Sequence, residues 1–201
     1  MIYYMAMIGL AAFAVSGVMA AGKKDMDIFS VVLLGMVTAL GGGTIRDVVI
    51  DVNPVFWIAD LSYFWVALAA SVIAFFMIRL ITHLSRLLLY LDAFGLALFT
   101  VLATEKTITM GFARPVAVLM GLATGIAGGM IRDVLTHRQT LLLSREFYAT
   151  PALLGAILFA ALDFLFPAHG YHQIYGTILI FGLRAAAIQW GLYYPRWLML
   201  K

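Results

Sequence analysis

The chain of 201 residues contains no cysteine and few charged residues. The lack of cysteine excludes disulfide scaffolds, thiolate metal sites and cysteine nucleophiles. Charged residues make up 11% of the sequence, whereas a soluble domain usually carries about 25%. Hydrophobic residues make up 64%, and the mean hydropathy is +1.03. These values predict a membrane protein with enough apolar sequence for about seven crossings of about 20 residues each.

The motifs of the common enzyme classes are missing as well. The sequence has no His-Glu-x-x-His zinc motif, no Gly-x-Ser-x-Gly nucleophile elbow and no phosphate-binding Gly-x-x-x-x-Gly-Lys-Ser/Thr loop. The net charge of +3 comes from basic residues dispersed at the ends of apolar segments, which argues against nucleic acid as a partner. The four histidines fall in connectors, where we expect them to be solvated. We therefore predict neither an enzyme nor a resident cofactor or metal.

Seven apolar segments, separated by short connectors, are predicted to cross the membrane as helices. They cover residues of about 2–22, 28–52, 61–81, 88–104, 114–136, 147–166 and 174–194. No linker or soluble domain is visible between them. The predicted fold class is an all-α membrane protein with a single transmembrane domain over residues 1–201, surrounded by membrane lipids.

A motif of glycines followed by Arg-Asp occurs twice, 86 residues apart. The first copy, from Gly41 to Asp47, reads Gly-Gly-Gly-Thr-Ile-Arg-Asp, and the second, from Ala127 to Asp133, reads Ala-Gly-Gly-Met-Ile-Arg-Asp. At this offset, eight of the fourteen positions from 35 to 48 are identical, and matches continue in the segments before and after. We predict two repeats of three helices, about 1–86 and 87–171, and a seventh helix over about 172–201.

The two repeats are predicted to have opposite orientations in the membrane. Each repeat has three spans, an odd number, so the second copy must enter the bilayer from the other side. With the N-terminus outside, eight basic residues lie at cytoplasmic ends: Lys23, Lys24, Arg79, Arg86, Arg138, Arg145, Arg196 and Lys201. The outer ends carry Lys106 and Arg114. The positive-inside rule then predicts that the N-terminus lies outside and the C-terminus in the cytoplasm.

The glycines of the repeated motif are predicted to break the second and fifth spans, because adjacent glycines weaken a helix. Freed carbonyl groups could replace part of the hydration shell of a permeant cation. The carbonyls concerned belong to Gly42, Gly43, Gly128 and Gly129. The hydroxyls of Thr38 and Thr124, one turn earlier, could add to such a path. In the alternative interpretation the glycines only allow close helix packing, since Gly35, Ala39 and Gly43 form a small-xxx-small ridge.

The Arg-Asp pairs lie within spans, where charges are costly unless they line a polar cavity or find partners. Arg46 and Asp47 should point about 100° apart on a helix, so we expect each to meet a group on another span. Arg46 and Arg132 either stand near the two mouths of a central pathway or form interhelical salt bridges, and the two roles can coexist. Arg184, near the middle of the seventh span, also needs a buried partner. The candidates are Asp92, Asp133 and Asp163.

The twice-repeated Gly-Gly-x-x-Arg-Asp in a seven-span chain of this length resembles the prokaryotic branch of the trimeric intracellular cation (TRIC) channel family. The resemblance covers essentially the whole chain and implies a multi-pass protein of a prokaryotic inner membrane. It implies a homotrimer in which each subunit has its own pore between the inverted halves, with the second and fifth spans shaping the constriction. It also implies permeation by monovalent cations, potassium or sodium, and mainly potassium. The pore residues that the motif carries over are Gly41, Gly42, Gly43, Arg46, Asp47, Gly128, Gly129, Arg132 and Asp133.

The residues alone leave the transported species open. Arginines in a pathway would suit an anion, whereas carbonyls would suit a cation. Similar bacterial sequences with this repeat are often described as small amino-acid transporters. The alternative function is therefore a secondary transporter or uniporter for a small zwitterion such as glycine, which would bind at the same midplane breaks. A further alternative is a structural membrane protein that only oligomerises.

Overall fold

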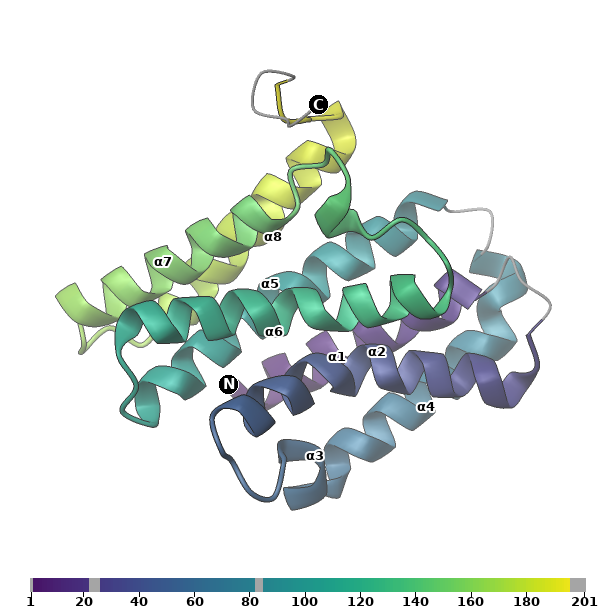
Figure 1. Cartoon of the computed structure of the whole chain (residues 1–201), viewed down its shortest axis with the longest axis horizontal. Helices are drawn as coiled ribbons and strands as arrows, with labels where there is room; N and C mark the ends of the chain where they lie inside the picture. Colours follow the sequence, from purple (N-terminus) through teal and green to yellow (C-terminus); the bar gives the residue numbers. More distant parts are fainter. Residues whose placement is uncertain (1, 22–25, 82–84, 196–201) are drawn as a thin grey trace.

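The computed structural model describes residues 2–21, 26–81 and 85–195, which form a bundle of helices (Figure 1). The long helices of this part are α1 (Ile2–Ala21), α2 (Ile28–Val49), α4 (Leu61–Ile81), α5 (Ser85–Thr109), α6 (Arg114–Leu135), α7 (Ala149–Leu165) and α8 (His172–Trp190). Two short helices lie in connectors: α3 (Phe56–Ala59) and the 3-10 helix η1 (Leu141–Leu143). The all-helical class is as predicted, and each long helix begins and ends near a predicted segment boundary.

Membrane-spanning character is clearest for four of these helices. Among the described residues, α1, α2, α6 and residues 86–109 of α5 are long and apolar enough to cross a membrane by length and composition. Residues 61–77 and 149–165 form shorter apolar helices. The helix α8 carries Arg184 and is less uniformly apolar. The chain is thus a membrane protein with at least four spanning helices.

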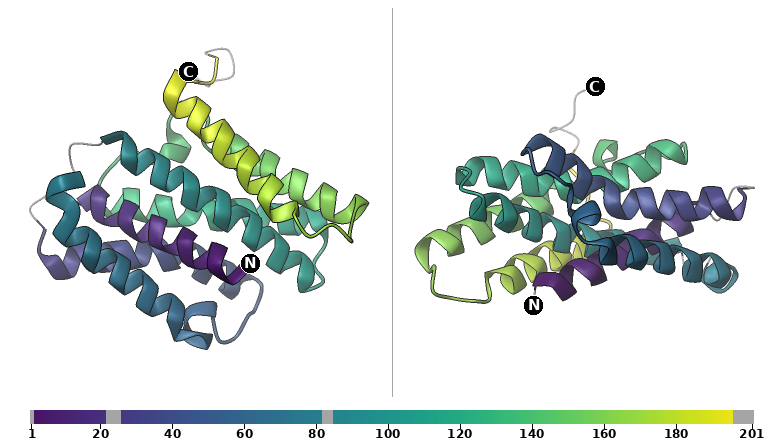
Figure 2. Two further views of the ribbon diagram at one scale, coloured as in Figure 1. Left: turned by 180° about the vertical axis from the view of Figure 1, so that it is seen from behind. Right: turned by 90° about the horizontal axis from the view of Figure 1, so that it is seen from below.

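The helices pack as two sets of three plus one. Helix α1 packs against α2 and α4, while α5 packs against α6 and α7. The two sets meet where α1 lies along α5 and α2 crosses α6, and α8 covers α5 and α7 (Figure 2). Each helix of the first set has the same neighbours within its set as the helix 86 residues later. The repeated motifs, at the ends of α2 and α6, are thereby brought to the interface between the sets.

The predicted interruption at the glycines is absent. Helix α2 is α-helical from Ile28 to Val49 and α6 from Arg114 to Leu135, through both glycine motifs. Their glycine carbonyls therefore lie within a continuous pattern of i to i+4 hydrogen bonds and are not freed for a cation. The prediction failed because tertiary packing of a neighbouring helix outweighs the weak intrinsic helix propensity of glycine.

Two of these glycines, Gly42 and Gly128, agree with the alternative interpretation, in which glycine allows close helix packing. A Cβ atom on Gly42 would lie against the carbonyl oxygen of Thr124, and one on Gly128 against the carbonyl oxygen of Thr38, both nearer than the 3.0 Å that real Cβ atoms keep. The two contacts are related by the offset of 86 residues. Helices α2 and α6 thus touch backbone to backbone where they cross, which only glycine permits.

The predicted orientation rests partly on residues that the structure does not describe. Lys23, Lys24, Arg196 and Lys201 lie outside the described residues, and so does the side chain of Arg79. The orientation stays a prediction. Below, the end of the bundle that contains the N-terminus of α1 is called the outer end, and the opposite end is called the inner end.

Candidate functional site

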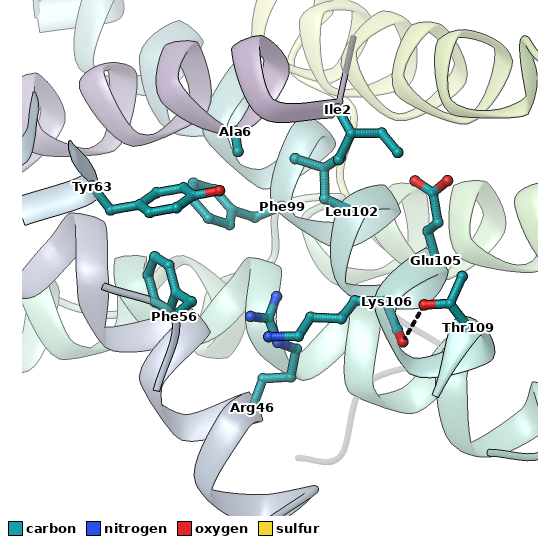
Figure 3. A pocket seen from close by; sticks show the side chains of 10 residues that line it. All are labelled: Ile2, Ala6, Arg46, Phe56, Tyr63, Phe99, Leu102, Glu105, Lys106 and Thr109. Atoms are coloured by element: carbon teal, nitrogen blue, oxygen red, sulfur yellow. Dashed lines mark hydrogen bonds between the residues drawn. The ribbon is translucent and has the colours of Figure 1, made fainter. Parts of the chain in front are cut away.

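A cavity of about 290 Å³ opens at the outer end of the bundle (Figure 3). We call it the outer vestibule. Its lining comes from α1, α2, α3, α4 and α5: Ile2, Ala6, Arg46, Phe56, Tyr63, Phe99, Leu102, Glu105, Lys106 and Thr109. Figure 3 shows Lys106 reaching toward Arg46, while Glu105 points away from both. The cavity is mostly apolar but carries three charged side chains.

A second cavity, of about 420 Å³, lies at the inner end. This inner vestibule is lined by Leu88, Leu89, Arg132, Asp133, Arg138, Gln139 and Leu141. Its lining begins near the start of α5, whereas the outer vestibule surrounds the end of that helix. At 1.5 Å per residue, Leu88 and Leu102 are about 21 Å apart along α5. The two cavities therefore approach the protein interior from opposite ends.

The arginine of each repeated motif faces one vestibule, and at the outer end it belongs to a buried charge cluster. The Nε and Nη2 atoms of Arg46 lie 2.8 and 2.7 Å from Oδ1 of Asp47. Lys106 Nζ binds the same oxygen at 2.8 Å, and the backbone amide of Phe56 donates to Asp47 Oδ2 at 2.8 Å. Two cations thus share one fully buried carboxylate, so this outer cluster has a net charge of +1.

The inner cluster has the same motif and the opposite net charge. Arg132 Nε donates to Asp133 Oδ1 at 2.9 Å, and its Nη1 donates to Asp92 Oδ1 at 2.7 Å and to the hydroxyl of Ser16 at 3.1 Å. The amide of Leu141 donates to Asp133 Oδ2 at 3.4 Å. One cation is shared by two carboxylates, and the net charge is −1.

The expected partners on other spans are present for Asp47, which binds Lys106, and for Arg132, which binds Asp92, but both arginines also pair with the adjacent aspartate. In both clusters the guanidinium bends back onto the adjacent carboxylate. The long arginine side chain spans the angular offset on the helix, and the second carboxylate oxygen caps the short helix that follows, α3 at Phe56 and η1 at Leu141. The third charge of each cluster, Lys106 or Asp92, has no counterpart in the other repeat and comes from α5. This difference creates the opposite charge of the two ends.

The predicted threonine and remaining glycine residues do not line either vestibule. Thr38 Oγ1 donates to the carbonyl of Leu34 at 2.7 Å and Thr124 Oγ1 to that of Met120 at 2.6 Å, so each hydroxyl is bound by its own helix. The other glycines receive side chains from neighbouring elements. Gly41 faces Ile131, Gly43 faces the ring of Phe56, and Gly129 faces Asp92 and the hydroxyl of Tyr148.

Arg184 has partners that the sequence did not indicate. Its Nη1 donates to the carbonyl of Phe147 at 3.0 Å, its Nη2 lies 3.5 Å from Glu146, and its guanidinium stacks over Tyr148 at 4.9 Å. All three belong to the connector before α7. The three predicted partners were therefore wrong: Asp92 and Asp133 bind Arg132, and Asp163 pairs with Arg114 at the surface at 3.3 Å.

A stacked aromatic pair lies beside the outer vestibule. The rings of Phe13 and Phe99 stack with centroids 5.4 Å apart, and both side chains are almost fully buried. Phe99 lines the outer vestibule. Phe13 lies on α1 between Ala6, another residue of the outer vestibule, and Ser16, a member of the inner cluster. Residues 13 and 99 are related by the offset of 86. The sequence analysis did not single them out, although their match within the repeat was the available signal.

Comparisons with known proteins agree with these features. A family model described as "Glycine transporter" matches residues 3–79 and 89–163, two segments whose starts differ by the same offset of 86. The inner membrane protein YadS of Escherichia coli K12, described as UPF0126, is 39% identical over 97% of this chain and 95% of its own length. The membrane protein YvgT of Bacillus subtilis 168, also UPF0126, is 33% identical over 94% of this chain and 93% of its own.

Two solved structures show the same fold. The TRIC trimeric intracellular cation channel orthologue from Rhodobacter sphaeroides matches with a TM-score of 0.91 and 41% identity, over 95% of this chain and 98% of the other. A prokaryotic TRIC channel crystallised in 0.5 M KCl matches with a TM-score of 0.88 and 28% identity, over 94% and 96% of the two chains. Both relatives are similar to this chain over nearly their whole length.

Proposed function

Because the chain belongs to the prokaryotic TRIC channel family, we propose that it is a channel for monovalent cations, mainly potassium, with one ion pathway inside each subunit. The observation that carries this proposal is the pair of vestibules that enter from opposite ends of the bundle, each lined by the arginine of one repeated motif. The permeant potassium or sodium ion is its only proposed ligand. The predicted sites at glycine carbonyls are replaced by a path along α1 and α5.

The proposed path follows one face of α1 and one face of α5. On α1 this face carries Ile2, Ala6, Phe13 and Ser16, at helical spacing from the outer vestibule to the inner cluster. On α5 the order runs from Leu88 and Leu89 through Asp92 and Phe99 to Leu102 and Lys106. Opening would require the Phe13 and Phe99 rings to move apart. In this proposal the stacked rings of Phe13 and Phe99 close the path.

The inner cluster supports cation over anion passage at that end. Asp92 and Asp133 outnumber Arg132 in a buried setting, where a charge acts more strongly than in water. Arg138, which also lines the inner vestibule, is exposed and its charge is more strongly screened. A permeating cation therefore meets a net negative buried charge on the inner side.

The assembly and orientation are part of the same proposal. The chain resides in a membrane, as its relatives named inner membrane proteins do. The solved relatives are named trimeric, and we propose a homotrimer here, with the N-terminus outside and the C-terminus in the cytoplasm. Within each subunit, the repeats of about 1–86 and 87–171 would form the two inverted halves. Cross-linking in mild detergent should yield a band at three times the mass of 22.0 kDa.

Electrical recording tests the proposed channel directly. In planar bilayers with a potassium chloride gradient, the purified protein is expected to pass stepwise current whose reversal potential has the sign of cation permeation. Current that reverses at the chloride potential would contradict cation selectivity. Complete absence of stepwise current in a folded preparation would contradict a channel.

A glycine transporter is the second candidate, favoured by the description of the matching family model. It predicts saturable flux of labelled glycine into liposomes without stepwise current. The structure supports it less than it supports a channel, because α2 and α6 are continuous and leave no opened backbone to bind the carboxylate and amine of a zwitterion. Glycine uptake that saturates in the absence of potassium current would decide for the transporter.

Replacement of Phe99 with alanine is expected to open the proposed path. Removing one ring of the stack takes away the packed barrier between the vestibules, so potassium efflux from liposomes should rise several-fold. Phe159→Ala is the matched control, since Phe159 is equally buried but lies on α7 away from both vestibules. Each variant should lose roughly 3–5 kcal/mol of stability to the cavity. Equal potassium efflux from the two variants would show that the aromatic pair does not lie on the ion path.

A further inference from the structure

Glu105 is a charged residue of the outer vestibule, directly after the predicted segment 88–104. Its side chain lines the cavity from α5 and points away from Arg46 and Lys106 (Figure 3). The amide Nε2 of Gln173, on α8, donates to Glu105 Oε1 at 2.6 Å. A side chain from the helix outside the two repeats thus holds this carboxylate in place.

The charge of Glu105 determines the net charge of the outer vestibule. Arg46, Lys106 and Asp47 together carry +1, which would repel an entering cation. With the carboxylate of Glu105 the sum of the outer vestibule becomes zero. At the inner end the buried cluster is already negative without any such addition. A cation path through both vestibules therefore depends on Glu105 at its outer end.

Oxygen atoms without hydrogen-bond partners occur on this carboxylate and on the α8 face that carries Gln173. Three buried oxygen atoms in the described part of the chain have no hydrogen-bond partner: Glu105 Oε2, Gln173 Oε1 and Thr177 Oγ1. Gln173 and Thr177 lie one turn apart on α8, so their side chains share a face of the helix. Such oxygens are the ligands that hard cations prefer. Their unmet hydrogen-bonding capacity would favour a cation that has lost part of its hydration shell.

At the start of α8, next to Gln173, one histidine is less exposed than the sequence predicted. His172, the first residue of α8, was predicted to be solvated, but only 6% of it is exposed and its ring lies edge-on to Phe159. The loop before α8 is therefore anchored into the bundle at this point. The anchoring fixes the start of α8 and with it the position of Gln173 beside Glu105.

We propose that Glu105, positioned by Gln173, is the carboxylate that attracts cations into the outer vestibule and excludes chloride there. This inference rests on the proposed channel function and deepens it. The position 86 residues earlier is Met19, so the inner end has no equivalent carboxylate. Charge selection at the outer end is thus a feature of the second repeat and α8 together.

The test is the permeability ratio of potassium to chloride, from reversal potentials of the reconstituted protein in a potassium chloride gradient. Glu105→Gln keeps the size and the amide-binding geometry but removes the charge. The ratio is expected to fall by about fivefold or more, because a charge that lines a low-dielectric cleft changes the local counter-ion concentration by about tenfold or more. Glu105→Asp should keep a ratio near that of the unchanged protein, and Gln173→Leu should lower it in the same direction.

Asp163→Asn is the matched control. It also removes one carboxylate at the outer end, but Asp163 lies at the surface in a pair with Arg114 and does not line the vestibule. Its ratio should change much less than that of Glu105→Gln, because the Asp163 carboxylate is partly exposed to solvent and paired with Arg114. Stepwise current with an unchanged ratio in a folded Glu105→Gln variant would overturn the role of Glu105 and leave the channel intact. Absence of current from the unchanged protein would overturn the channel and this inference with it.

Discussion

Replacing Arg132 with methionine is expected to lower the free energy of unfolding by about 3–5 kcal/mol, the cost of removing one partner from a buried ion pair. Methionine fills much of the same volume but leaves Asp92 and Asp133 buried together without their shared cation. The loss should be visible as an earlier unfolding transition in mixed detergent micelles. Asp92→Leu added to the first change should restore part of the stability, because it removes one of the two stranded carboxylates.

Arg114→Met provides the comparison for Arg132. Arg114 also pairs with an aspartate, but its side chain is 44% exposed and its partner Asp163 is 31% exposed. Exposed pairs of this kind contribute about 0–1 kcal/mol, so this variant should unfold close to the unchanged protein. If both arginine variants lost equal stability, the assignment of Arg132 to a buried charge cluster would be wrong. Equal stability of Arg132→Met and the double variant would show that Asp92 is not coupled to Arg132.

Replacing Gly42 with alanine is expected to destabilise the bundle by about 1–3 kcal/mol, the usual range for overpacking. The new methyl group would press on the carbonyl oxygen of Thr124, a backbone atom of α6 that cannot rotate away. Helices α2 and α6 would have to separate at their crossing. Gly128→Ala should have a similar effect, because its methyl group would meet the carbonyl of Thr38 in the related contact.

Gly182→Ala is the control for both glycine variants. Gly182 also lies inside a helix, but nothing lies within 4 Å of a Cβ atom built there. Alanine should therefore leave the stability unchanged or raise it by up to about 1 kcal/mol through its better helix propensity. Thermal unfolding in detergent measures all three variants. A stable Gly42→Ala variant would mean that the two helices do not touch at this point.

Much of the architecture could be predicted from apolar segment lengths. The predicted segment 61–81 coincides with α4, and 114–136 differs from α6 by one residue at its end. Segment lengths work well here because a bilayer requires long runs of apolar side chains with internally satisfied backbones. The short helices α3 and η1 were missed, since each is held by an aspartate contact from the preceding helix. Such a contact leaves no periodic signal in the sequence.

The candidate site could be predicted only in part. The repeated motif drew attention to Arg46 and Arg132, which line the two vestibules. Their partners could not be predicted, because Lys106, Asp92 and Ser16 come from helices far away along the chain. The same holds for Arg184, whose partners lie in a connector that has no charge pattern of its own. Pairing of buried charges depends on distances that sequence spacing does not contain.

The sequence by itself determined that this is a helical membrane protein built from two similar halves, because composition and an offset of 86 residues are properties of the chain alone. Only the tertiary structure decided what the glycines do. Seen in the sequence, Gly42 and Gly128 weaken a helix; in the fold, each receives a backbone carbonyl of the other helix, and both helices stay intact. The tertiary structure also decided that the two Arg-Asp clusters carry opposite net charge, because packing of α5 brings Lys106 to one and Asp92 to the other.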